Sequence, residues 1–418
     1  MLRSRILFIA CVLCFALSLS ACQNPFFQPG ETDLSEPVPT EKDKGQHEQV
    51  TEPEPAPTPP TTVTLAAAGD IMMHSTQIKA ARQSDGSYDF HDVFADIRPY
   101  LQAADLGFAN LETTFGGNEP YSGYPMFNAP DEVADALQEA GFDLIQTANN
   151  HTMDTRAEGA VRTYNVLKER GMEPVGTAPS SADRKPVLIE KNDITLAFLA
   201  YTYGTNGIPV PEDQPYLVNL IDEDMIEQDI LAAKADGAEF IVVGLHFGNE
   251  YQREPTEAQR ELVTRIFEMG ADVILGGHPH VLQPMEHMEI GGEDKFVIYS
   301  LGNLVSNQFS YTVSNPYVNK GIILYLDIVK DYEQETVTLK DVRYLPTVVH
   351  RYEQNGIGYA IVPIEEQHID EGSLAYDYPG LSLQMIEEAW EQTTSHMKQY
   401  ESFPTFQLDE GAEPAETQ

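Results

Sequence analysis

The sequence predicts an α/β fold for the region that begins near residue 62. Short apolar segments of strand length alternate there with segments whose apolar residues recur at helical spacing, which is typical of strands connected by helices. A polar cluster directly follows most of the apolar segments, and the chemistry of α/β folds collects at the carboxyl ends of the strands. With 418 residues, 42% of them hydrophobic, the chain is long enough for one large domain or two smaller ones.

The expected strands are short and apolar, and the expected helices lie between them. The strands cover 63–68, 106–109, 144–148, 196–201, 240–245, 273–275 and 296–299. The helices cover 130–140, 158–170, 224–236 and 256–269. Two later segments, 321–329 and 336–344, alternate apolar and polar residues in the manner of antiparallel strands that close a sheet. We therefore expect one folded domain over residues 62–350.

The C-terminal part of the chain carries no motif that indicates a function. Within residues 351–418, the segment 383–400 has a helical pattern and contains Trp390, the single tryptophan. The run 409–418 is polar. We expect this C-terminal extension to be partly helical, with a disordered end.

The first residues have the pattern of a bacterial export signal. A basic start and a short apolar run, 6–19, precede Leu19-Ser-Ala-Cys22, which resembles a lipobox. We expect residues 1–21 to be a lipoprotein signal peptide and Cys22 to be lipidated. An ordinary cleaved signal, or an uncleaved anchor, is the alternative. The Pro-rich, acidic segment 22–61 predicts a disordered tether, so the domain is expected to be lipid-anchored at the cell membrane and to face outside.

Charge and cysteine content exclude several classes of function. The chain has 25 Lys and Arg against 66 Asp and Glu, a formal net charge of −41, so a basic face for nucleic acid is not expected. The three cysteines, Cys11, Cys14 and Cys22, all lie in the first 22 residues. The folded region therefore has no cysteine for a disulfide, a zinc site or a nucleophile.

The polar clusters after the strands combine carboxylates, amides and histidines. They are Gly69-Asp70 with His74, Asn110-Leu-Glu112, Asn149-Asn150-His151, His246-Phe-Gly-Asn-Glu250, Gly277-His278-Pro-His280 and Ser300-Leu-Gly-Asn303. Carboxylate oxygen and imidazole nitrogen without sulfur suit Zn, Mn or Fe, and a bridging carboxylate suits two ions about 3.5–4 Å apart. The sequence thus predicts a site for one or two divalent metal ions.

These motifs, in this order, resemble the CapA/PgsA family of poly-γ-glutamate capsule biosynthesis proteins. The resemblance covers roughly residues 62–330 and rests on G-D-I-M (69–72), N-L-E-T (110–113), N-N-H-x-x-D (149–154), H-F-G-N-E-Y (246–251), G-H-P-H-V (277–281) and S-L-G-N (300–303). The family is in turn similar to the calcineurin-like metallophosphoesterases. The resemblance therefore implies a layered α/β/β/α sandwich with a two-metal centre.

The resemblance also implies roles for individual residues. The metal ligands would be Asp70, Glu112, Asn150, His246, His278 and His280, with Glu112 as the bridge. His151 would be the catalytic acid, oriented by Asp154. Three features depart from the phosphoesterase pattern: D-x-H has become Asp70-x-x-x-His74, the bridging aspartate is a glutamate, and G-N-H is Asn149-Asn150-His151.

Several of these residues have a structural alternative. Asp70 could cap the following turn, and Glu112 could be a buried salt-bridge partner. His74 is either a substitute for the phosphoesterase histidine or a surface or packing residue. Glu250 could support the ligand His246, and Asn303 could either form a turn or contact the substrate. Tyr121, Tyr124 and Tyr311 could line a binding groove or be packing residues.

The resemblance implies a lipid-anchored extracellular protein in poly-γ-glutamate synthesis or export, acting on this anionic polymer. The sequence contains no G-x-x-x-x-G-K-[ST] motif, so ATP-driven ligation would need membrane subunits of a polymer synthase as partners. Two alternatives remain open: a metallohydrolase that cleaves a phosphoester or an amide of a cell-surface polymer, and a non-catalytic binding or scaffold module.

Overall fold

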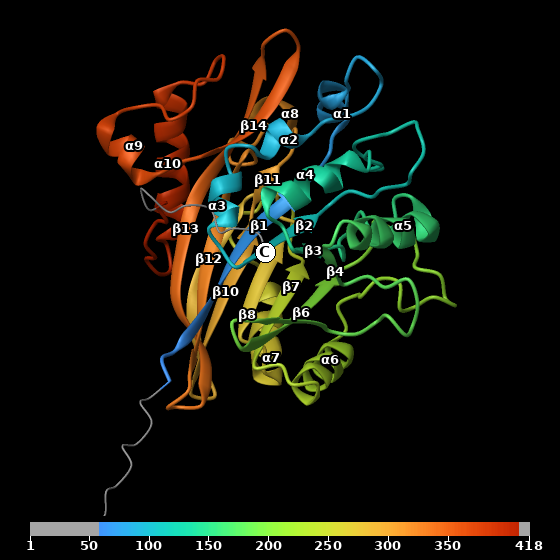
Figure 1. The fold of residues 1–418 in the computed structure, drawn as a ribbon, viewed down its shortest axis with the longest axis vertical. Helices are drawn as coiled ribbons and strands as arrows, with labels where there is room; N and C mark the ends of the chain where they lie inside the picture. The colour runs from blue at the N-terminus through green and yellow to red at the C-terminus, as the bar shows by residue number, and fades with distance from the viewer. Residues whose placement is uncertain (1–57, 409–418) are drawn as a thin grey trace, which may run out of the picture. The chain divides into compact units, whose positions relative to one another are not determined.

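The computed structural model describes residues 58–408 of the chain. The predicted signal peptide, the lipidation site Cys22, nearly all of the predicted tether and the end from 409 onward lie outside the described residues. The predicted layered α/β/β/α arrangement is confirmed, because two sheets face each other and helices cover their outer faces (Figure 1).

The first sheet contains the N-terminal strands and the strands that close the domain. Its strands follow the order β14-β13-β12-β1-β2-β3-β4, and β11 pairs with β1. Their bounds are β1 Thr61–Ile71, β2 Leu106–Leu111, β3 Leu144–Gln146, β4 Glu173–Val175, β11 Asn303–Val305, β12 Lys320–Asp331, β13 Thr336–Glu353 and β14 Ile357–Pro363. The neighbours β1, β2, β3 and β4 run parallel, whereas β12, β13 and β14 are antiparallel, as the sequence predicts for the closing strands.

The second sheet follows the order β5-β6-β7-β8-β10-β9. Its bounds are β5 Val187–Lys191, β6 Ile194–Thr202, β7 Phe240–His246, β8 Val273–Gly277, β9 Leu282–Ile290 and β10 Glu293–Leu301. The four central strands are parallel, and β5 and β9 are antiparallel edges. Every strand predicted from the sequence is present in one of the two sheets.

The helices form the two outer layers. Those on the first sheet are α1 Ser75–Ala81, α2 His91–Phe94, α3 Arg98–Gln102, α4 Glu132–Ala140 and α5 Arg156–Glu169, and those on the second are α6 Glu223–Ala235 and α7 Glu257–Met269. Three short or C-terminal helices complete the fold: α8 Ser310–Val313, α9 Glu366–Glu371 and α10 Leu383–Met397. In α7, Thr256 caps the first turn together with Gln259, and the helix ends at Gly270, whose φ of 108° few other residues adopt readily.

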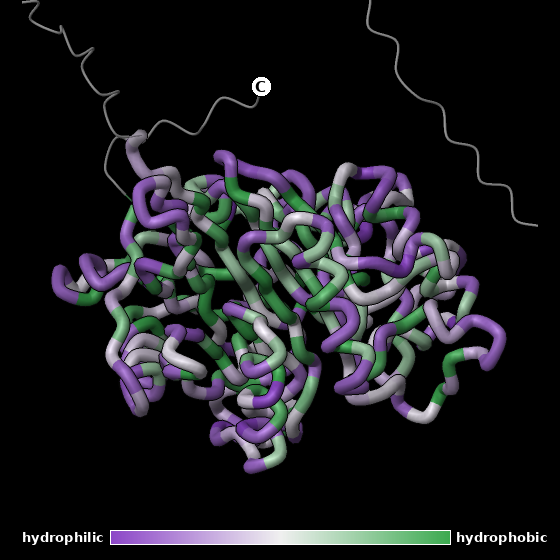
Figure 2. The backbone as a smooth tube through the Cα atoms, turned by 90° about the horizontal axis from the view of Figure 1, so that it is seen from below, coloured by the Kyte–Doolittle hydropathy of each residue, from purple (hydrophilic) through white to green (hydrophobic). Residues whose placement is uncertain are grey.

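The core lies in three apolar layers because the central strands are buried on both faces. In β1, Val63 and Leu65 point between the two sheets, whereas Ala66 and Ala68 pack under the first helical layer. In the backbone tube of Figure 2, hydrophobic segments run through the interior and hydrophilic loops surround them. This double burial explains why the strands appear in the sequence as continuous apolar runs rather than alternating ones.

The boundary predicted after residue 350 needs correction. β13 continues to Glu353, and β14 pairs with it as the edge of the first sheet. The exposed turn around 354–356 interrupts the apolar pattern there, although the backbone pairing continues on both sides of it. Beyond β14, α10 packs on the sheet through Ile386 and Ala389, so the extension is partly helical and shares the core of the domain. Within residues 58–408, no helix combines the length and the apolar character that a membrane span requires.

Candidate metal centre

The fold brings the predicted polar clusters together at one edge of both sheets. Asp70 lies near the end of β1, Glu112 follows β2, and His246 is the last residue of β7. His278 and His280 follow β8 directly. All five side chains are buried. The carboxyl ends of parallel strands from two different sheets thus converge on one point.

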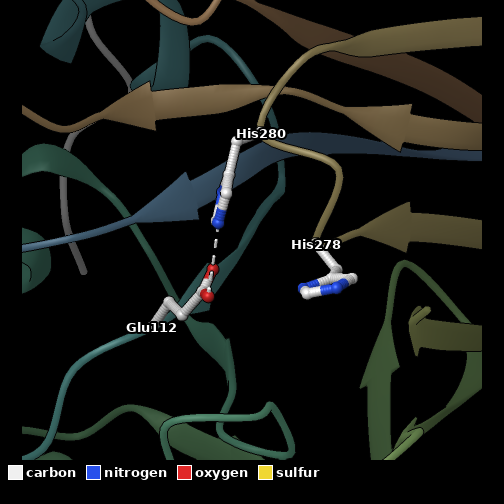
Figure 3. Close-up of side chains that lie close together, drawn as sticks. All are labelled: Glu112, His278 and His280. Atoms are coloured by element: carbon white, nitrogen blue, oxygen red, sulfur yellow. Dashed lines mark ion pairs between the residues drawn. The ribbon is translucent and has the colours of Figure 1, made fainter. Parts of the chain in front are cut away.

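Two overlapping groups of side chains could hold a metal ion. One consists of Glu112, His278 and His280, and the other of Asp70, Glu112 and His246, with the ligand atoms of each group within 4.8 Å of one another. Figure 3 shows the first group, with the Glu112 carboxylate facing the His280 ring. Glu112 belongs to both groups, which is the position expected of a bridging carboxylate. Asp70 also lies beside His280, with 3.2 Å between Asp70 Oδ2 and His280 Nδ1.

Among residues 58–408, neither carboxylate oxygen of Glu112 has a hydrogen-bond partner, although the side chain is fully buried. Oε1 lies 3.7 Å from the Nε2 atoms of both His246 and His280, and 3.9 Å from Nε2 of His151. Burial raises the pKa of Glu112 well above its ordinary value. A conventional buried salt bridge would satisfy these oxygens, so the arrangement favours a role for Glu112 as a ligand.

Asp70 is held by the residues around it and does not cap a helix. Its Oδ1 accepts a hydrogen bond from Asn110 Nδ2 (2.8 Å), and its Oδ2 accepts one from the backbone N–H of His278 (3.1 Å). A Cβ atom at Gly277 would lie 2.7 Å from Asp70 Oδ1, so only glycine allows β8 to approach this carboxylate so closely. The first helix after β1 is capped by His74 instead.

The pKa values of the three histidines shift in different directions. Burial lowers the pKa of His246 well below its ordinary value and lowers that of His278 to about 4. Burial also acts against a charge on His280, but the carboxylates of Glu112 and Asp70 outweigh it and raise its pKa to about 9. His278 and His280 have φ angles of 96° and 58°, a left-handed backbone that residues other than glycine adopt uncommonly.

Amide side chains connect the ligands. Asn150 Oδ1 lies 2.9 Å from His246 Nε2, so Asn150 joins the cluster as predicted. Asn110 contacts both Asp70 and His246 Nδ1 (3.3 Å), and Asn149 donates to Asn110 Oδ1 (3.1 Å) and to the carbonyl oxygen of Leu111. Asn110 and Asn149 belong to the sequence motifs but were not predicted as site residues. Their positions next to Glu112 and Asn150 in those motifs could have indicated that they lie in the site.

His151 and Asp154 form the predicted pair beside the cluster. His151 Nδ1 lies 2.7 Å from Asp154 Oδ2, which also accepts the backbone N–H of Phe127 (2.6 Å). The Nε2 atom of His151 therefore faces Glu112, whose Oε1 lies at 3.9 Å, and Asn206, whose Nδ2 lies at 3.4 Å. Asn206 comes from the loop after β6 and has a φ of 48°. The sequence analysis missed Asn206 because no motif marks this loop.

The three residues predicted as substrate contacts or supports have different surroundings. Asn303 is buried, its Oδ1 lies 3.1 Å from His280 Nδ1, and its amide group donates to Gln308 and Val318, so it orients the His280 ring. His74 accepts the backbone N–H of Asn307 and packs edge-on against Phe127. Glu250 makes no hydrogen bond to His246 among the described residues, but it lines a pocket of about 470 Å³ together with His74, His151 and His280.

The structure distinguishes packing from groove-lining positions for the three tyrosines considered in the sequence, Tyr121, Tyr124 and Tyr311. Tyr121 packs edge-on against Tyr88, Tyr311 stacks on Phe309, and Tyr124 lines the same pocket with 73% of its surface exposed.

The residues present fit a divalent metal centre. Oxygen and imidazole nitrogen ligands converge, and among the described residues the two oxygens of Glu112 and Nδ1 of His278 have no hydrogen-bond partner. No cysteine is available in the folded region, which leaves Zn, Mn and Fe as ions suited to this ligand set. The metal ligands would be Asp70, Glu112, His246, His278 and His280, with Asn150 completing the set.

A protein-family model matches more than half of the chain. The model of the family described as bacterial capsule synthesis protein PGA_cap matches residues 64–308. The capsule biosynthesis protein CapA of Bacillus anthracis is 30% identical over 255 residues, which cover 59% of this chain and 60% of that protein. The PGA biosynthesis protein CapA of Bacillus subtilis (strain 168) is 30% identical over 246 residues, which cover 57% of this chain and 62% of that protein. The chain thus matches about 60% of the length of these relatives.

Two nucleotidases are among the solved structures that resemble the chain. The NAD nucleotidase NadN of Haemophilus influenzae gives a TM-score of 0.43 at 13% identity, over 80% of this chain and 68% of that chain. A putative 5'-nucleotidase from Staphylococcus aureus gives 0.42 at 13% identity, over 79% of this chain and 58% of that chain. At these TM-scores the likeness adds nothing to the layered arrangement seen in this chain.

Proposed function

The chain belongs to the bacterial capsule synthesis family PGA_cap, and on this premise we propose that it is a metal-dependent hydrolase of the phosphoesterase type that acts in capsule production. Family membership confirms the resemblance indicated by the six sequence motifs. The hydrolase proposal is carried by Glu112, a fully buried carboxylate that has no hydrogen-bond partner and lies within reach of three histidines.

The chemistry divides between a bound metal and the protein's own groups. A divalent ion at this centre would supply a Lewis acid and an activated water. His151 supplies the proton for the leaving group, and it lies beside the ligands at the edge of the pocket. Asp154 Oδ2 accepts a hydrogen bond from Nδ1–H, which orients the ring so that Nε2 is turned toward the site. Asn206 Nδ2 lies 3.4 Å from that nitrogen.

The cellular setting is part of the same proposal. The lipobox-like sequence that ends at Cys22 and the Pro-rich tether support attachment of the domain by a lipid to the outer face of the cell membrane. The names of the two CapA relatives refer to capsule and PGA biosynthesis, and they support poly-γ-glutamate, an anionic polymer, as the product that this chain helps to make or export. Membrane subunits of a polymer synthase are the proposed partners, because the sequence has no nucleotide-binding P-loop.

Metal analysis and hydrolysis by the purified full chain test this proposal. We expect one or two transition-metal ions per chain and turnover of a generic phosphodiester. His278→Ala should lose metal and turnover, whereas His151→Ala should keep its metal and lose turnover by about 100-fold or more. A chain that binds no metal, or a His151→Ala variant that is as active as the wild type, contradicts the hydrolase.

A second candidate follows from the relatives' names: a subunit that handles the polymer without breaking a bond. It predicts bound metal without turnover of either a phosphodiester or poly-γ-glutamate. In cells, polymer output would then fall in the His278→Ala variant and persist in the His151→Ala variant. The hydrolase predicts a fall in both.

A further inference from the structure

A pocket opens directly beside the candidate metal centre. It has a volume of about 470 Å³, and His151 and His280 are among its lining residues. The mechanism does not use the other lining residues, which include His74, Tyr124, Glu250, Tyr251 and Gln308. Because His151 is the proposed proton donor, the group that leaves in the reaction occupies this space.

The charge of the pocket wall restricts what can bind there. No Lys or Arg is among its lining residues, and Glu250 contributes an exposed carboxylate. The formal net charge of the chain, −41, adds a repulsive background. An anionic leaving group would therefore meet the negative charge of Glu250, and no Lys or Arg of the pocket wall offsets that charge.

The wall is instead rich in groups that bind hydroxyls. His74 Nδ1 accepts the N–H of Asn307, so its Nε2 carries the proton and can donate. Tyr251 accepts a hydrogen bond from Gln308 Nε2 (3.3 Å), and its hydroxyl adds a hydrogen-bonding group beside the Glu250 carboxylate. Glu250 supplies two acceptor oxygens, and Tyr124 offers a largely exposed ring as an apolar platform. Donors, a carboxylate and an aromatic face around one space suit a sugar ring.

We propose that this pocket binds an uncharged, hydroxyl-rich leaving group, such as the glycosyl unit of a sugar phosphate, and discriminates against anionic groups. The inference rests on the proposed phosphoesterase function and names its substrate class. In the reaction, a water oxygen bonds to phosphorus and the bond from phosphorus to the sugar oxygen breaks. The proton on His151 Nε2 passes to that oxygen, and the proton released by the attacking water restores His151, so the products are inorganic phosphate and the free sugar. A glutamate polymer is thereby disfavoured as the leaving group.

Three sugar phosphates whose sugar units are neutral, cationic and anionic test the inference. Glucose 1-phosphate, glucosamine 1-phosphate and glucuronic acid 1-phosphate are compared with the full, metal-loaded chain, and p-nitrophenyl phosphate reports general activity. We expect kcat/KM for glucose 1-phosphate to exceed that for the glucuronic acid ester by about tenfold or more. Glu250→Gln should reduce this ratio at least about threefold. Glu257→Gln removes the same charge from the exposed start of α7 and should leave the ratio unchanged.

The possible failures are distinguishable. Equal or faster turnover of the glucuronic acid ester overturns the inference, and a tenfold preference for glucosamine 1-phosphate assigns the pocket to cations instead. Turnover of p-nitrophenyl phosphate alone also overturns it, while the hydrolase stands. Absence of all turnover contradicts the proposed function. In that case a binding measurement tests the pocket assignment independently of turnover. Saturation-transfer NMR on metal-free protein should detect methyl glucoside and not methyl glucuronide, and the opposite result refutes the pocket assignment.

Discussion

Two buried polar clusters in this domain contain side-chain atoms without hydrogen-bond partners. One is the metal centre, with the carboxylate oxygens of Glu112 and Nδ1 of His278. The other lies under the C-terminal helix α10 and is called here the helix cluster. Its unpartnered atoms are Arg253 Nε, Gln392 Oε1 and Thr393 Oγ1. The presence of unpartnered buried atoms does not by itself show which of the two clusters binds a ligand.

The chemical character of the atoms separates the two clusters. In the helix cluster, donors and acceptors are mixed. Arg253 donates to the carbonyl oxygen of Gln392 (3.0 Å) and lies over the Tyr317 ring, and Lys320 donates to the carbonyl oxygen of Pro316 (2.6 Å). In the metal centre, carboxylate oxygens and ring nitrogens converge within 4.8 Å. Converging ligand atoms of this kind need a cation, whereas mixed groups need only a few water molecules.

The largest effect is expected from a substitution of Glu112, the carboxylate shared by the two ligand groups of the metal centre. Glu112→Gln should weaken metal binding by about 100-fold or more, because it removes the shared anionic ligand. In the metal-free state the same variant should be more stable than the wild type, since a buried carboxylate without partners is costly. Metal analysis together with urea unfolding in the presence of a chelator measures both effects.

Glu257→Gln is the matched control for charge, because it changes an exposed carboxylate at the start of α7. It should bind metal as the wild type does. Unchanged metal content in Glu112→Gln would place the ion elsewhere in the chain.

Adding metal should affect only one of the two clusters. At a free Mn²⁺ concentration about 100 times the dissociation constant, the free energy of unfolding should rise by about 2.7 kcal/mol. Hydrogen exchange should slow locally at the ends of β1, β2 and β8, where the ligands lie, and stay unchanged in α10. Equal protection of α10 would show that the two clusters are coupled.

A pH series tests the helix cluster. Burial lowers the pKa of Lys320 to about 8, so between pH 8 and the ordinary lysine pKa of 10.5 the unfolded chain holds a proton that the folded chain has lost. Raising the pH through this window therefore stabilises the folded state, by up to about 2 kcal/mol. Lys320→Met should lack this increment in urea unfolding at about pH 8 and about pH 10. The same pH response in both proteins would exclude Lys320 as its source.

The smallest effect is expected at Thr393, which is 1% exposed and has an unpartnered hydroxyl. Thr393→Val keeps the shape and removes the hydroxyl, so the free energy of unfolding should change by less than about 1 kcal/mol, toward greater stability. Metal content should not change. A loss of several kcal/mol would show that the hydroxyl binds an ordered water after all, and would set the helix cluster closer to the metal centre.

The sequence predicts the parts of the fold that depend on local pattern. The runs 63–68, 240–245 and 273–275 become β1, β7 and β8 because strands buried on both faces are apolar throughout. It does not predict β11 or β14, since β11 has only three residues and β14 follows an exposed turn. The pairing of these strands depends on partners that are distant in the chain.

The amino-acid sequence alone contains the chemistry of the candidate site: the residue types, their order after the strands and the motifs of the family to which the chain belongs. Which of these groups meet depends on the three-dimensional packing. It makes Glu112 common to two ligand groups, turns Asn303 toward His280 rather than into the pocket, and adds Asn206 from an unmarked loop. The physical reason is that strand ends are encoded locally, whereas distances between them are set by how two sheets pack.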